Sequence, residues 1–241
     1  MKSMQTNKIL VICPSRGRAK VAETFVKSWK ETQSGFSDML LMLDDDDKTD
    51  YSDAKGVEGV NTVITDICRK ETRDKNWFRG SAMMYDAGYK MCPNYKYYGI
   101  FSDDMIFRTK DWDKKMVEAI EEGGGWGVIH GEDLASHKGV HPVVSANLIK
   151  IVGYFSVKGL IHLRVDRTWI DIGKGSGLLY CLKDVIIEHM HPHWGKGKFD
   201  GTYRPLRTQE LKNYDTTIYN KWKEKELPKI IENIKEAIKC K

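Results

Sequence analysis

Short apolar runs alternate with segments of helical spacing along the first half of the chain, and this alternation constrains the fold more than any other feature. Runs of strand length lie at Lys8–Cys13, Met39–Leu43, Asn61–Ile67 and Tyr97–Phe101. Helical spacing lies between them, at Ala19–Lys30 and Arg79–Lys90. The alternation predicts an α/β fold with a mostly parallel sheet flanked by helices, in which ligands bind at the carboxyl ends of the strands.

The second half of the chain is less regular. Gly123–Gly127 precedes a predicted strand, Val143–Val152 is rich in strand-forming residues, and Asp184–Glu188 leads into a histidine cluster. From Leu206 to Lys241 the chain is charged and predicted to be helical, with a break at Pro228. We therefore expect one domain over residues 1–241, made of a nucleotide-binding half (1–110), an acceptor half (111–205) and a helical C-terminal extension (206–241).

Composition excludes several classes of protein. The 241 residues are 41% hydrophobic and 30% charged, which is typical of an ordinary globular domain. The five cysteines are scattered without a CxxC spacing, so neither a disulfide framework nor a cysteine-zinc site is predicted. No apolar run approaches the roughly 20 residues of a membrane span, and no signal-peptide cleavage site follows the N-terminus. A cytoplasmic protein without a membrane span is the expectation.

Polar residues follow the first strand, where they can meet a nucleotide. The turn contains Pro14, Ser15, Arg16 and Arg18, with a permissive glycine between the two arginines. Neither GxxxxGK[ST] nor GxGxxG occurs, which argues against phosphate-loop and dinucleotide-binding proteins. The alternative is a solvated turn whose arginines pair with nearby acids.

Acidic residues follow the second and fourth predicted strands. Asp44 and Asp45 open a run of four aspartates that is suited to the ribose or base of a nucleotide, or is a solvated loop. Asp103 and Asp104 follow the Tyr97–Phe101 strand and so lie at the same sheet edge. Their hard oxygen ligands suit Mg²⁺ or Mn²⁺ bridging a diphosphate.

A histidine cluster and a lone acid complete the candidates. His189, His191 and His193 alternate in the sequence, so an extended chain presents them on one side. With Asp103 and Asp104 they suggest a mixed oxygen and nitrogen site for manganese.

Lys196 and Lys198 follow on a glycine-rich loop, where they either close over phosphates or keep the loop soluble. Asp166 is either a general base or a helix cap. The tryptophans Trp126, Trp169 and Trp194 either stack on a sugar or base or, as is more common for this residue, lie in the core.

In this order, the residues resemble the GT-A glycosyltransferases, in particular family 2-like enzymes and small bacteriophage-encoded members. Ile9–Arg18 resembles their opening strand and nucleotide loop, and Leu43–Asp47 their second-strand acidic segment. Ser102-Asp103-Asp104 lies where the family has its DxD metal motif, with the two acids adjacent here. Asp166 matches the acidic base, and His189 or His191 the late histidine ligand.

The resemblance implies a GT-A fold and a metal-dependent transfer, with inversion, from a nucleotide sugar to an acceptor hydroxyl, as in a hexosyltransferase. The expected donor is a UDP-sugar held with Mn²⁺ or Mg²⁺. Asp166 would take the acceptor proton, and Asp103, Asp104, His189 and His191 would bind the metal. The remaining donor contacts are assigned to Pro14, Ser15, Arg16, Arg18, Asp44, Asp45, Arg79, Lys196 and Lys198. For a phage-encoded member, modified bases of DNA in the host cytoplasm are one candidate acceptor.

Two other functions are compatible with the same residues. A metal-dependent hydrolase or nuclease would activate water at the Asp/His cluster, but would not need the polar turn and the acidic run at successive strand ends. A nucleic-acid-binding module without catalysis fits the formal charge of +5. The basic residues are scattered, however, and the acidic clusters would repel phosphate.

Overall fold

The observed elements follow the predicted alternation. The structure is a computed structural model that describes residues 6–67, 80–136, 139–206 and 208–240. Its strands are β1 (Thr6–Ser15), β2 (Ser37–Asp44), β3 (Val60–Thr65), β4 (Tyr95–Ile100), β5 (Met105–Phe107), β6 (Val128–Glu132), β7 (Val143–Ser145) and β8 (Leu179–His189). Its helices are α1 (Ala19–Thr32), α2 (Ser52–Lys55), α4 (Ala82–Met91), α5 (Trp112–Glu122), α6 (Ala146–Val152), α7 (Val165–Ser176), the 3₁₀ helix η1 (Pro192–Trp194), α8 (Tyr203–Leu206), α9 (Gln209–Lys225) and α10 (Leu227–Lys239).

The strands form one eight-stranded sheet in the order β3-β2-β1-β4-β7-β6-β8-β5. The first four strands in this order are parallel to one another. β7 is antiparallel to both of its neighbours, and β5 is antiparallel to β8 at the far edge. Ile9–Cys13 in central β1 are all buried, which is the pattern of a parallel strand covered on both faces. The predicted α/β fold with a mostly parallel sheet is confirmed.

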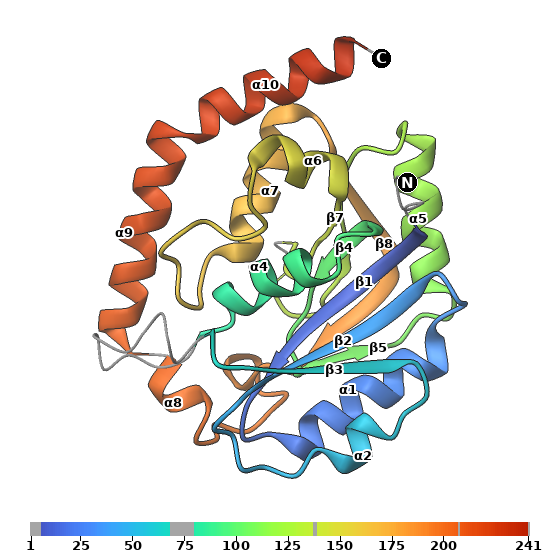
Figure 1. Ribbon diagram of the computed structural model, residues 1–241, viewed down its shortest axis with the longest axis vertical. Helices are drawn as coiled ribbons and strands as arrows, with labels where there is room; N and C mark the ends of the chain where they lie inside the picture. The colour runs from blue at the N-terminus through green and yellow to red at the C-terminus, as the bar shows by residue number, and fades with distance from the viewer. Residues whose placement is uncertain (1–5, 68–79, 137–138, 207, 241) are drawn as a thin grey trace.

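Helices cover both faces of the sheet (Figure 1). On one face α1, α2 and α5 pack in one hydrophobic cluster, and on the other face α4, α6 and α7 pack in a second cluster that includes α9 and α10. α1 shows how the sequence dictates this: Ala22, Phe25, Val26 and Trp29 follow helical spacing and are all buried. The C-terminal extension is helical as predicted, and its two long helices meet at Glu226, just before Pro228.

The expectation for Val143–Val152 was wrong in its second half. β7 ends at Ser145, and residues 146–152 form α6. Ser145 has extended backbone angles at the helix N-cap, and Gly153 ends the helix with a φ of 88°. The β-branched residues Ile149, Ile151 and Val152 hid this helix, because side chains of that type also favour strands.

Asp215 of α9 fixes the segment that leads into α7. Its side chain is fully buried and accepts hydrogen bonds from the backbone N–H groups of Ile161 (2.9 Å), His162 (3.0 Å) and Leu163 (2.7 Å). Burial raises the pKa of Asp215, although these three donors oppose the rise. The C-terminal helices are therefore tied to the start of α7, where Asp166 lies.

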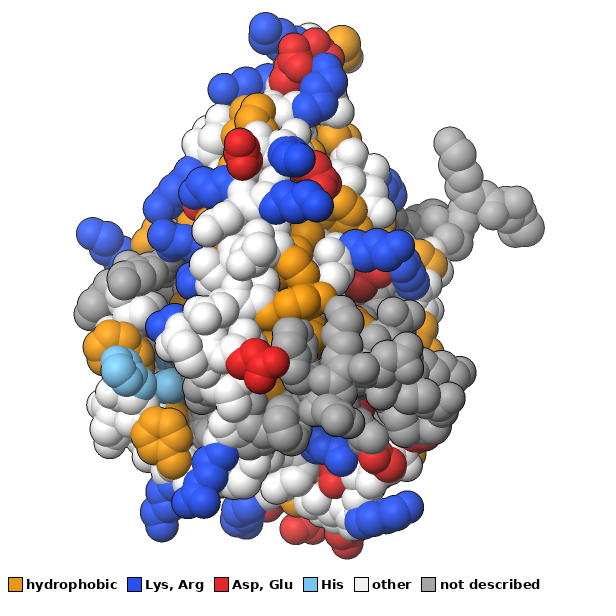
Figure 2. Space-filling view, turned by 90° about the vertical axis from the view of Figure 1, so that its left-hand side faces the viewer, with side chains coloured by type: hydrophobic (Ala, Val, Ile, Leu, Met, Phe, Trp, Pro, Cys, Tyr) orange, Lys and Arg blue, Asp and Glu red, His pale blue; other side chains and the backbone are white. Residues whose placement is uncertain are grey.

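The helices and the charged side chains of the surface agree with two expectations from the sequence. Within the described ranges, no helix has the length and apolar character that crossing a membrane requires. On the face shown in Figure 2, Lys and Arg side chains are spread out and interrupted by acidic ones. On that face the positive charge is not gathered into one patch.

Candidate active site

Three parallel neighbours, β2, β1 and β4, bring the candidate residues to one edge of the sheet. β1 ends at Ser15 and continues into the turn with Arg16 and Arg18, while β2 ends at Asp44. The chain after β4 carries Asp103 and Asp104 to the same edge. The sequence-based placement of these acids beside the first turn is what the structure has.

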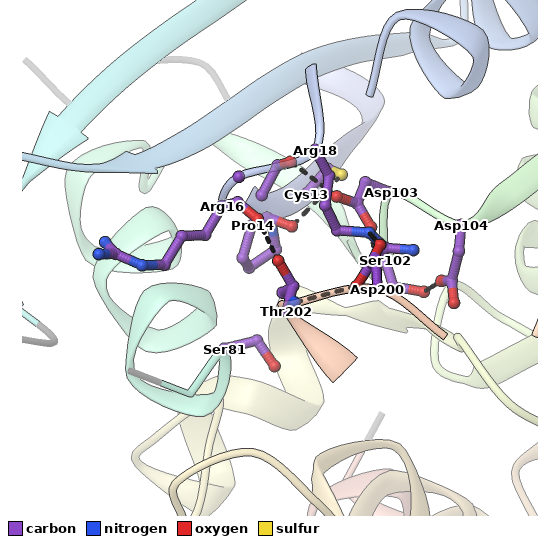
Figure 3. Close-up of polar contacts among 12 residues, drawn as sticks. Cys13, Pro14, Arg16, Arg18, Ser81, Ser102, Asp103, Asp104, Asp200 and Thr202 are labelled. Atoms are coloured by element: carbon purple, nitrogen blue, oxygen red, sulfur yellow. Dashed lines mark hydrogen bonds and ion pairs between the residues drawn. The ribbon is translucent and has the colours of Figure 1, made fainter. Parts of the chain in front are cut away.

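Arg18 joins two carboxylates that are distant in the sequence (Figure 3). Its Nη1 lies 2.6 Å from Oδ1 of Asp103, and its Nε lies 3.0 Å from Oδ2 of Asp200. The hydroxyl of Ser15 donates to Oδ2 of Asp103 at 2.6 Å. Asp103 therefore meets both a cation and a hydroxyl donor from the first turn.

Asp103 is almost completely buried, and this governs its charge. Burial, opposed by Arg18 and reinforced by the neighbouring Asp104, raises the pKa of Asp103 to about 7. Burial, followed by the charges of Asp103 and Asp104, also raises the pKa of the Cys13 thiol well above its ordinary value. Cys13 is thus a protonated core residue below the acidic pair.

The acidic run after β2 packs against the same turn. Arg16 Nη1 lies 3.0 Å from Asp44 Oδ2 and 2.7 Å from Asp46 Oδ1. Asp47 accepts hydrogen bonds from the backbone N–H of Gly17 (2.8 Å) and from the hydroxyl of Tyr51 (2.9 Å). Asp45 is exposed. Repulsion within the run is therefore offset by donors of the β1–α1 turn and by the Tyr51 hydroxyl.

The segment that contains Asp200 and Thr202 packs against the β1–α1 turn. The hydroxyl of Thr202 donates to the carbonyl oxygen of Arg16 at 2.8 Å, and the Asp200 side chain accepts from the Thr202 N–H at 3.0 Å. Gly17 has a φ of 66°, and a Cβ atom there would lie 3.3 Å from the Thr202 hydroxyl. Glycine at this position thus permits both the left-handed backbone conformation and the close approach of the Thr202 side chain.

Asp104 points away from Arg18, toward the histidines at the end of β8. Its Oδ2 lies 3.3 Å from Nε2 of His189, and its Oδ1 accepts a hydrogen bond from Ser102. The rings of His189 and His191 are 5.1 Å apart between centroids, and His191 is buried. η1 begins at Pro192 and turns His193 out to an exposed position, so His189 and His191 are the two of these three clustered histidines that lie at the site.

The Asp104–His189 pair fits a divalent cation. Two ligand atoms at about 2.1 Å from an octahedral ion, and at right angles, are about 3.0 Å apart, close to the observed 3.3 Å. A carboxylate oxygen with an imidazole nitrogen is a donor set that suits manganese. In the described part of the chain, no group of three His, Cys, Asp or Glu side chains is arranged to hold an ion alone. The remaining ligands would have to come from a substrate or water.

His141 also belongs to this site, although no sequence pattern predicted it. Its ring lies 5.1 Å from the His189 ring and stacks on Phe101 at 6.3 Å. Burial, and then the nearby His189, lower the pKa of His141 to about 4, against the negative charges of Asp104 and Asp166. A single histidine far from any motif in the sequence gave no signal, since only folding brings it beside Ser102.

Asp166, the predicted general base, is held at the start of α7. It stands in the first turn of α7, half-buried, and its Oδ1 accepts from the N–H of Arg167 at 2.7 Å. Its charge acts on the pKa of both Tyr85 and His141, as does the charge of Asp104. Both carboxylates therefore lie within electrostatic reach of these two side chains.

The remaining residues predicted to contact the donor, and the three tryptophans, differ in how buried they are. Lys196 Nζ lies 2.8 Å from Glu188 Oε1 and donates to the carbonyl of Leu134, while Lys198 is exposed. Pro14 is half-buried at the end of β1, and Arg79 lies outside the described residues. Of the tryptophans, Trp169 is in the core, Trp126 packs against it, and Trp194 is exposed.

Comparison with known proteins shows the fold. No family model and no curated protein matches the sequence. Among solved structures, the chain is similar to S. aureus TarS, with 12% identity and a TM-score of 0.57 over 76% of this chain. The chain covers only 36% of that longer protein.

Two similar structures are matched over most of their length. One is the mannosyltransferase PcManGT from Pyrobaculum calidifontis with GDP-Man and Mn²⁺, at 11% identity and a TM-score of 0.55, covering 99% of this chain and 75% of that one. The other is Mycobacterium tuberculosis glucosyl-3-phosphoglycerate synthase with Mn²⁺, UDP-glucose and phosphoglyceric acid, at 10% identity and a TM-score of 0.58, covering 88% and 79%. These likenesses show that the chain has the GT-A fold.

The buried Arg18–Asp103 pair generates a stability prediction. Removing one partner of a buried ion pair leaves an uncompensated charge, so Arg18→Met should lower the free energy of unfolding by about 3 kcal/mol. Arg18→Met with Asp103→Asn should recover much of this loss, because no charge is then stranded. Urea unfolding at pH 8 measures both.

The matched control is Lys30→Met, which removes an exposed cation from its pair with the exposed Glu58 and should leave stability unchanged. A double variant no more stable than Arg18→Met alone would show that Asp103 is not the charge that Arg18 offsets.

Proposed function

We propose that this protein is a metal-dependent glycosyltransferase that moves a sugar from a nucleoside-diphosphate sugar to an acceptor hydroxyl. One observation carries the proposal. Within a GT-A fold, the Asp104–His189 pair lies at the edge of the sheet where the two arginines of the β1–α1 turn are also held. A cation-binding pair beside two guanidinium groups is the chemistry that a diphosphate requires.

The donor's diphosphate would lie between the turn and the Asp104–His189 pair. Arg18 is already oriented by Asp103 and meets Asp200 on its other side, so a phosphate could replace the Asp200 carboxylate at the same guanidinium. Arg16 is held near the acidic run, where Asp44 and Asp45 would bind the ribose or base. Pro14, Ser15, Lys196, Lys198 and Arg79 remain proposed contacts of the donor.

Asp104 and His189 would hold a divalent cation, with Mn²⁺ preferred over Mg²⁺ because one donor is a nitrogen. When bound, the cation supplies positive charge to the leaving diphosphate. His191 is buried beside His189 and would be a further ligand or a neighbour that fixes that ring. Asp103 would orient Arg18, because both of its oxygens already accept from the first turn.

The acceptor side would lie around Asp166. Asp166, whose charge acts on His141 as that of Asp104 does, would take the proton of an attacking hydroxyl, and attack on the side opposite the leaving group would invert the sugar. In this view residues 1–110 bind the donor, 111–205 form the acceptor side and 206–241 support α7. A UDP-hexose is the proposed donor, since the similar synthase is bound to UDP-glucose. Nucleic acid, including modified phage DNA in the host cytoplasm, is one proposed acceptor class.

One prediction tests the donor site. With Mn²⁺ present, calorimetry should detect UDP or GDP binding. Asp104→Ala should abolish the metal-dependent part of the affinity, because alanine offers no oxygen to a cation. Asp45→Ala is the control, since this exposed acid of the neighbouring run should affect the affinity with and without Mn²⁺ alike.

Two results would contradict this assignment. Equal Mn²⁺-dependent affinity in the parent and in Asp104→Ala would place the cation elsewhere. Release of free sugar from the donor at the full rate without any acceptor would favour the metal-dependent hydrolase.

Another prediction concerns the general base. Asp166→Asn keeps the size and hydrogen bonding of the side chain but removes its basicity, so turnover should fall roughly 10²-fold or more while donor affinity stays the same. Single-turnover transfer and calorimetry measure the two quantities. Asp171→Asn, in the same helix but paired with Lys223, is the control and should retain turnover. Parental turnover in Asp166→Asn would mean that another residue is the base.

A further inference from the structure

Ser102 can donate its single hydroxyl hydrogen to either of two acceptors. One is Oδ1 of Asp104, and the other is Nε2 of His141, 3.4 Å from the hydroxyl oxygen. A hydroxyl can serve only one strong acceptor at a time. The shorter contact, to Asp104, holds the hydrogen in this structure, so His141 is the alternative.

The backbone contacts of His141 decide which ring nitrogen is the acceptor. Nδ1 lies 3.1 Å from the carbonyl oxygen of Ile100, and a carbonyl only accepts, so Nδ1 carries the hydrogen. In the neutral ring Nε2 then has a lone pair that faces Ser102. A second proton on Nε2 would bury an imidazolium against the His189 ring. The ring is therefore held as a neutral acceptor.

The position of His141 is costly to maintain. Its φ of 56° is left-handed, a conformation that a non-glycine residue adopts at an energetic cost. The segment is pinned to the end of β4 from both sides, since Ile100 N–H donates to the carbonyl of Pro142 at 3.0 Å. Strain of this kind is found at functional sites more often than elsewhere.

We propose that His141 is a positioning residue for Asp104: it accepts the Ser102 hydroxyl when Asp104 takes up a divalent cation. Oδ2 of Asp104 already faces His189, and turning the hydroxyl away releases Oδ1. Only a hydroxyl rotation is needed, and no proton leaves its oxygen. The inference rests on the proposed function, because it assigns Asp104 to the cation.

The test is Mn²⁺ affinity in the presence of UDP, measured from the electron paramagnetic resonance signal of the free ion. His141→Asn tolerates the left-handed backbone and retains an N–H for Ile100, but has no acceptor at the Nε2 position. It should bind Mn²⁺ about tenfold more weakly, the usual effect of removing a group that orients a metal ligand. His141→Gln, which reaches the Nε2 position with its amide oxygen, should restore most of the affinity.

A double-mutant cycle with Ser102→Ala separates positioning from packing. Without the hydroxyl, no hydrogen has to move to an alternative acceptor to release Asp104, so His141→Asn should then have little effect on Mn²⁺ affinity. His141→Gly adopts a positive φ freely and provides the same comparison if His141→Asn does not fold. An equal loss with and without Ser102, or no recovery in His141→Gln, would overturn the inference.

The two proposals fail in different ways. A parent protein that binds no Mn²⁺ with UDP would overturn both. A parent that binds Mn²⁺ through Asp104, while His141→Asn binds it equally well, would overturn only the role of His141.

Discussion

The site depends on one constraint: carboxylates are buried at the carboxyl ends of parallel strands, and each must find a cation or donors there. Asp103 meets this requirement through Arg18 and Ser15, and Asp44 through Arg16. These contacts fix the β1–α1 turn against β2 and the chain after β4. Two guanidinium groups are therefore held in place before any ligand arrives, which reduces the ordering cost of anion binding.

The adjacent residues Asp103 and Asp104 have different partners and different proposed roles. Asp103 points to the first turn, whereas Asp104 points to the end of β8, where His189 and His141 lie. Adjacent acids cannot both be charged in a dry site without a counter-charge on each side. Arg18 supplies that charge for Asp103, and in our proposal a divalent cation supplies it for Asp104.

Much of the fold could be predicted from the sequence, because parallel strands buried on both faces leave clear apolar runs such as Ile9–Cys13. The acids at the strand ends could be placed at one edge for the same reason. α6 was missed, since its β-branched residues resemble a strand and only Ser145 and Gly153 mark its ends. His141 and Thr202 could not be found, because their partners Ser102 and Arg16 lie far away in the chain and no spacing rule links them.

The central claim is that the Asp104–His189 pair holds the cation that binds the donor diphosphate. Pulsed electron paramagnetic resonance of Mn²⁺ in the protein–UDP complex tests it directly, because a coordinated imidazole nitrogen couples to the unpaired electrons of the ion. The account predicts a nitrogen coupling in the parent protein that His189→Gln weakens or removes. A Mn²⁺–UDP complex bound to the parent without any imidazole coupling would contradict it.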